Sequence, residues 1–82
     1  MRKILLSEYK DSMGVLICLN ITDDLKINKV KYISYDDLLT NYREILDKNK
    51  KYYIYCNSGI RSKKAVMILE YYGYDVTLVL KQ

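Results

Sequence analysis

The residues best suited to covalent chemistry lie in one short segment, which reads Cys56-Asn57-Ser58-Gly59-Ile60-Arg61-Ser62. A cysteine thiolate is a strong nucleophile, and an arginine pairs readily with anionic groups. The chain has no histidine, so it contains neither a Cys-His pair nor a Ser-His-Asp triad. Any nucleophile in this protein must therefore be activated by the backbone or by nearby charge.

The segment lies between a predicted strand and a predicted helix. Residues 52–55 are tyrosine and isoleucine, which favour strands, and apolar residues recur at helical spacing after Arg61. In a loop between the carboxyl end of a parallel strand and a helix N-terminus, successive N–H groups point inward and bind anions. Such a loop favours the thiolate, so we expect the pKa of the Cys56 thiol to be lowered.

The other residues of the segment have predicted roles around this thiol. Gly59 allows the tight bend that the loop needs, and Ser58 can donate a hydroxyl hydrogen bond. Arg61 can either pair with an anionic substrate group or bind carbonyl groups of the loop, and the sequence leaves both alternatives open. Lys63 and Lys64 add positive potential at the mouth of the loop.

Strands and helices alternate along the chain. Short apolar or alternating runs predict strands at 14–19, 30–33, 52–55 and 76–80, and residues 4–6 form a further short apolar run. Amphipathic spacing predicts two helices, one over 35–47 with Ser34 as its N-cap, the other after Arg61 and ending at Gly73. This alternation predicts a small α/β domain with a parallel sheet flanked by helices.

The spacing of Cys56, Gly59, Arg61 and Ser62, followed by Lys64-Ala65 and Tyr72-Gly73-Tyr74, resembles the single-domain rhodanese family. The resemblance covers the C-terminal third of the chain. It implies a rhodanese fold and a catalytic Cys56 that cycles through a persulfide. It also implies a substrate-binding loop made of Asn57, Ser58, Gly59, Ile60, Arg61 and Ser62. The implied partners are a small anionic sulfur donor, such as thiosulfate or a persulfide, and a thiol or cyanide acceptor.

The sequence departs from the family pattern at two places. Cys18-Leu19-Asn20 stands where the family usually has Asp-x-Arg, so we expect an ion pair near the loop to be missing. The family usually continues into a further helix, whereas this chain stops at Gln82. An open sheet edge would favour pairing with a second copy, and a homodimer is therefore one hypothesis.

Three other functions stay open. The first is a cysteine phosphatase or arsenate reductase, although such enzymes carry one more residue between cysteine and arginine than the four found here. The second is a non-catalytic rhodanese-like module that binds proteins. The third is a redox protein that pairs Cys56 with Cys18, but Cys18 lies in an apolar run and is better explained as a core residue.

Composition bounds the remaining expectations. With 82 residues and half of them apolar, the chain predicts one globular domain spanning 1–82. No apolar run is long enough to cross a bilayer or to serve as a signal peptide, so we expect a cytoplasmic protein that does not bind membranes. The net charge of +4 is too small to indicate nucleic-acid binding. No metal or cofactor is expected, and the bias toward lysine, isoleucine, tyrosine and asparagine hints at a bacterial source.

Overall fold

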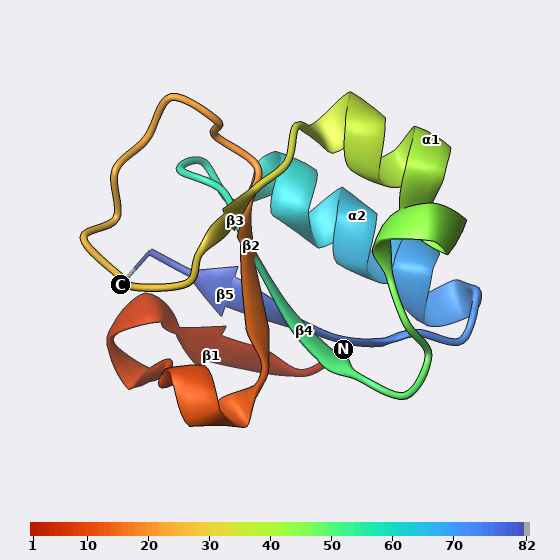
Figure 1. Cartoon of the computed structure of the whole chain (residues 1–82), viewed down its shortest axis with the longest axis horizontal. Coiled ribbons are helices and arrows are strands. Elements are labelled where there is room, and N and C mark those ends of the chain that lie inside the picture. Colours follow the sequence, from red (N-terminus) through yellow and green to blue (C-terminus); the bar gives the residue numbers. More distant parts are fainter. Residues whose placement is uncertain (82) are drawn as a thin grey trace.

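Five parallel strands form one sheet in the computed structural model, which describes residues 1–81 (Figure 1). They are, in chain order, β1 (Lys3–Leu5), β2 (Val15–Cys18), β3 (Lys31–Tyr32), β4 (Lys51–Tyr55) and β5 (Asp75–Leu80). Their order across the sheet is β1-β5-β4-β2-β3, and each neighbouring pair is parallel. The predicted small α/β fold with a parallel sheet and helices is confirmed. Each predicted strand is found, with ends shifted by at most one residue, and the apolar run at 4–6 overlaps β1.

The helix α1 (Tyr35–Ile45) begins as its sequence predicts. The Ser34 hydroxyl accepts the backbone N–H of Asp37 at 3.1 Å, and Asp36 and Asp37 lie in the first turn, where carboxylates complement the helix dipole. The helix ends two residues earlier than predicted. Leu46 is already in an extended conformation there and directs the chain toward β4.

The helix α2 (Ile60–Tyr71) follows the cysteine loop. It begins two residues earlier than predicted, because Gly59 is its N-cap, and Ile60 and Arg61 therefore belong to the helix and not to the loop. At the other end Gly73 adopts the predicted left-handed conformation, with φ 92°. The N–H of Gly73 donates to the carbonyl of Glu70 and that of Tyr74 to the carbonyl of Leu69, both at 3.0 Å, which satisfies the last carbonyl groups of the helix.

The two faces of the sheet are covered differently. Both helices lie on one face, where Leu38 of α1 and Leu69 of α2 pack with Ile54 of β4 in the larger core cluster (Figure 1). The opposite face carries a smaller cluster made of Leu16, Cys18, Tyr53, Tyr55 and Val79. The N-terminal 3-10 turns and the connection between β2 and β3 cover it, contributing Tyr9, Met13, Leu25, Ile27 and Val30. A helix layer is therefore present on one face only.

The carboxyl ends of the central strands bring the cysteine loop to one edge of the fold. Cys18, the last residue of β2, is in register with Tyr55, the last residue of β4. The pairing extends one step further, because the N–H of Leu19 donates to the carbonyl of Tyr55 at 2.8 Å. Residues that follow β2 and β4 therefore meet at the edge where ligands bind in parallel α/β sheets.

Candidate active site

Cys56 is the first residue after β4 and lies at the floor of the loop. Only 3% of its surface is exposed, and its side chain joins the core cluster on the helix-covered face. Side chains alternate along a strand, so Cys56 and Tyr55 point to opposite faces of the sheet. The thiol is therefore held between the end of a central strand and the start of α2.

Backbone and hydroxyl groups converge on the Cys56 sulfur. The N–H groups of Gly59 and Ser62 donate to Sγ at 3.2 Å and 3.3 Å, and the Ser62 hydroxyl lies 3.2 Å from it. The Ser58 hydroxyl is further away, at 3.8 Å. The left-handed conformation of Gly59, with φ 78°, turns the chain so that its N–H points back at the sulfur. This arrangement is the inward-pointing loop that the sequence predicts.

These contacts decide the ionisation of the thiol. Burial is the largest single influence and favours the neutral thiol. The hydrogen bonds from the side chain and N–H of Ser62, from the Ser58 hydroxyl and from the Gly59 N–H together outweigh it, and the pKa of Cys56 is lowered below its ordinary value. The structure thus replaces the absent histidine with hydrogen bonds that stabilise the thiolate.

We expect Ser62→Ala to raise the pKa of the Cys56 thiol, because Ser62 is fully buried and its hydroxyl contacts the sulfur. A hydrogen bond to a charged group contributes about 1.5 kcal/mol, so alkylation by iodoacetamide at neutral pH should slow about tenfold. The native and variant rates should converge at high pH, where both sulfurs are thiolates. Ser12→Ala, at an exposed serine, is the control, and an unchanged pH profile in Ser62→Ala would contradict this account.

The first loop residue after the cysteine is held by two side chains. The N–H of Asn57 donates to Oδ1 of Asn20 at 2.7 Å, and the Tyr55 hydroxyl donates to Oδ1 of Asn57 at 3.3 Å. Asn20 follows β2 and stands where the family has the arginine of Asp-x-Arg. Neither of the two ion pairs found in residues 1–81 lies at the loop, in keeping with the expected loss of an ion pair. A neutral hydrogen bond anchors the loop at this point.

Arg61 packs beside a tyrosine ring instead of binding carbonyl groups of the loop, and its pairing with an anionic substrate group stays a prediction. Its side chain is exposed, and its guanidinium carbon lies 5.7 Å from the centre of the Tyr35 ring, at the start of α1. This is a cation–π distance. Tyr35 therefore holds the arginine beside the loop, and the guanidinium stays accessible to solvent and to an anionic substrate.

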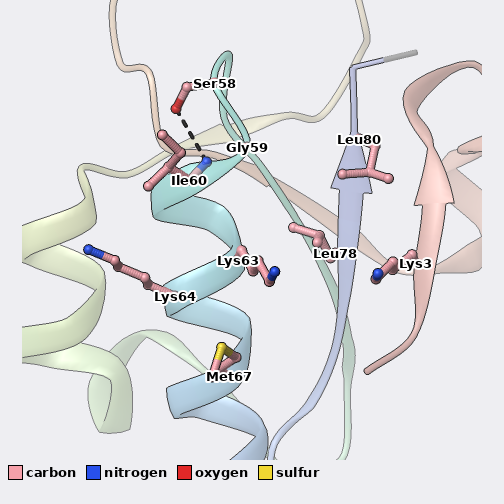
Figure 2. A pocket seen from close by; sticks show the side chains of 9 residues that line it. All are labelled: Lys3, Ser58, Gly59, Ile60, Lys63, Lys64, Met67, Leu78 and Leu80. Carbon is pink, nitrogen blue, oxygen red and sulfur yellow. Dashed lines mark hydrogen bonds between the residues drawn. The ribbon is translucent and has the colours of Figure 1, made fainter.

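The structure places the predicted loop residues at different depths. Cys56 and Ser62 are buried, whereas Asn57, Ser58, Ile60 and Arg61 are exposed around them. Ser58 also accepts the N–H of Ile60 on its hydroxyl at 3.3 Å, which fixes the turn into α2 (Figure 2). Ser62 thus contacts the Cys56 sulfur from the protein interior, and the exposed residues form the rim of the loop, from which the Ser58 hydroxyl lies 3.8 Å from the sulfur.

Sequence reasoning did not find Asn20, Tyr55 or Tyr35 as parts of this site. The sequence did contain a reason to consider Asn20. This residue aligns with the arginine of the family's Asp-x-Arg and lies at the carboxyl end of a predicted strand. The packing of Tyr35 near Arg61 depends on how α1 lies against α2. A local sequence pattern does not predict the relative position of two helices.

Cys18 is confirmed as a core residue. Its side chain is fully buried in the cluster on the face opposite to Cys56, and burial raises the pKa of its thiol. Both cysteines are free. A disulfide between them would have to join side chains from opposite faces of the sheet, so the structure does not favour the redox pairing that the sequence left open.

The described part of the chain has neither a metal-binding cluster nor a membrane-spanning helix. Residues 1–81 contain no group of three or more histidine, cysteine, aspartate or glutamate side chains that could hold a metal ion. No helix among these residues is both long and apolar enough to cross a membrane.

The sequence matches the model of one known protein family. Residues 8–82 match the family described as the Rhodanese-like domain, and the chain belongs to this family. No curated protein matches the sequence.

Solved structures agree with this family. A rhodanese-related protein from Thermoplasma volcanium is 23% identical with a TM-score of 0.76, over 99% of this chain and 85% of that one. A rhodanese-like domain protein from Staphylococcus aureus is 27% identical with a TM-score of 0.77, over 99% of this chain and 86% of that one. An NAD-dependent persulfide reductase from A. fulgidus is 26% identical with a TM-score of 0.75, over 98% of this chain but only 15% of that protein.

Proposed function

We propose that this protein is a sulfurtransferase or sulfur carrier that moves sulfane sulfur through a persulfide on Cys56. The observation that carries the proposal is the set of hydrogen-bonding groups around one buried sulfur. The N–H groups of Gly59 and Ser62 donate to it, and the Ser62 hydroxyl accepts the S–H of the neutral thiol and can donate to the thiolate. These donors lower the pKa of the thiol, so the nucleophilic thiolate is available without a histidine base.

The proposed reaction has two steps. In the first, the Cys56 thiolate attacks the outer sulfur of thiosulfate, a new S–S bond forms, and the S–S bond of the donor breaks so that sulfite leaves with the electron pair. In the second, cyanide or a thiolate attacks the terminal sulfur of the persulfide. The Cys56 thiolate is the leaving group and is ready for another cycle.

The rim residues have proposed roles in this cycle. The accessible guanidinium of Arg61, held beside the loop by Tyr35, would attract the anionic donor. The N–H of Gly59, which already reaches Sγ, and the N–H of Ser58 would stabilise the terminal sulfur anion of the persulfide. The N–H of Ile60 donates to the Ser58 hydroxyl. The N–H of Asn57 already binds Asn20, so its proposed role is to keep the loop in place.

Steady-state formation of thiocyanate from thiosulfate and cyanide tests the proposal. We expect saturation in both substrates with the parallel double-reciprocal lines of ping-pong kinetics. Hydrolysis of p-nitrophenyl phosphate by the same sample is the second arm of the test. Phosphatase activity without thiocyanate would favour the phosphatase hypothesis, and inactivity in both arms would favour a protein-binding module.

A further inference from the structure

A groove lies beside α2 on the helix-covered face of the sheet (Figure 2). At this point β5 and β1 lie to one side of the helix, which does not cover them. Its volume is about 480 Å³. Its lining comprises Lys3, Ser58, Gly59, Ile60, Lys63, Lys64, Met67, Leu78 and Leu80. None of the roles assigned to the cysteine loop requires this space.

The groove opens directly at the candidate active site. Ser58 and Gly59 line one end of it, and both contact the Cys56 sulfur, through the Ser58 hydroxyl and the Gly59 N–H. A molecule that lies in the groove therefore has one end at the rim of the loop. This position suits the partner that delivers or removes the sulfur atom.

The walls of the groove are positive and its floor is apolar. Lys3 of β1 lies on one side, in register with Leu78 of β5, and Lys63 of α2 points in from the other side (Figure 2). The ammonium group of Lys64 points away from the groove, toward α1. In residues 1–81 no aspartate or glutamate lines the groove, and neither ion pair involves these lysines. Met67, which is 55% exposed, lines the groove together with Leu78 and Leu80 of β5. The surface therefore complements a partner that combines carboxylates with an apolar side chain.

The shape of the groove favours a peptide. The part of α2 that lines the groove, from Ile60 to Met67, is about 10 Å long. This is the length of about three residues of an extended chain. The groove is open along this length, whereas small-molecule sites usually enclose most of their ligand. A second copy of this chain is less well suited, because its net charge is also +4.

We propose that the groove binds an extended acidic segment of a partner protein, with an apolar residue on its floor and a cysteine at the loop. The inference rests on the proposed sulfurtransferase function. The partner's thiol would lose its proton to solvent and attack the terminal sulfur of the Cys56 persulfide. A persulfide would form on the partner, and the Cys56 thiolate would leave.

Peptide binding tests the groove without any sulfur chemistry. The probe is a short fluorescein-labelled peptide of alternating glutamate and leucine that lacks cysteine, and binding to Cys56→Ser protein is followed by fluorescence anisotropy. We expect saturable binding that weakens about tenfold when Lys3→Glu and Lys63→Glu are combined, because two attractive pairs become repulsive. Lys50→Glu, which lies outside the groove, should leave the affinity within about twofold of the parent.

Two results would overturn the groove proposal: equal binding of a peptide with lysine in place of glutamate, or equal weakening by Lys50→Glu. Circular dichroism of each variant shows whether the fold is kept, and Met67→Glu gives a second substitution in the groove that should also weaken binding. Peptide binding without thiocyanate formation would remove the sulfurtransferase proposal and keep the groove. Thiocyanate formation without peptide binding would do the reverse.

Discussion

Replacement of Cys56 by serine is expected to reduce thiocyanate formation by at least about a thousandfold, to the rate without protein. Serine is similar in size, and its hydroxyl can keep contacts with the Gly59 and Ser62 N–H groups that now reach the sulfur. It cannot form a persulfide, however, and the loop has no second nucleophile of comparable strength. The measurement is the initial rate with saturating thiosulfate and cyanide.

Cys18→Ala is the matched control, since it removes the other cysteine from the fully buried core of the opposite face. The change leaves a small cavity that should cost about 1 kcal/mol of unfolding free energy and leave the initial rate within about twofold. Equal loss of activity in both variants would indicate a redox mechanism that needs both thiols. Residual activity in Cys56→Ser would contradict the assignment of the nucleophile.

Gly14→Ala is expected to lower the unfolding free energy by about 3 kcal/mol, the upper part of the usual cost of overpacking. A Cβ atom at Gly14 would lie 2.5 Å from the carbonyl oxygen of Lys51 and 2.9 Å from Cε1 of Tyr53. The residue directly precedes β2, so relief of this contact would displace β2 from β4. Urea denaturation followed by circular dichroism measures the change.

Gly59→Ala serves as the comparison for this second prediction. A Cβ at Gly59 would meet no atom within 4 Å, so the cost is that of the left-handed conformation alone, about 1 kcal/mol. If Gly14→Ala proved no more destabilising than Gly59→Ala, close packing between β2 and β4 at this point would be disproved.

Local patterns in the sequence predicted the elements of the fold well. Ser34 and Gly73 mark helix ends through side-chain and left-handed caps, which depend on neighbouring residues only. The strand, cysteine loop and helix from Lys51 to Tyr71 also follow from local composition. The same locality allowed Cys56 to be placed at the floor of a loop with inward-pointing N–H groups, although the hydroxyl closest to its sulfur is that of Ser62 and not the predicted Ser58.

The features that were not predicted depend on contacts between distant segments. The binding of Asn57 by Asn20 and the packing of Arg61 on Tyr35 arise only when β2, β4 and the two helices come together. The groove likewise depends on β1 pairing with β5, which places Lys3 opposite α2. Sequence periodicity carries no information about such pairings, because it reports one element at a time.

The most direct test of the account is the intact mass of the protein after incubation with thiosulfate, compared with that of Cys56→Ser. We expect the native chain to gain the mass of one sulfur atom, cyanide to remove it, and the variant to gain nothing. A native chain that gains no mass, although iodoacetamide alkylates Cys56 in the same sample, would contradict the persulfide mechanism.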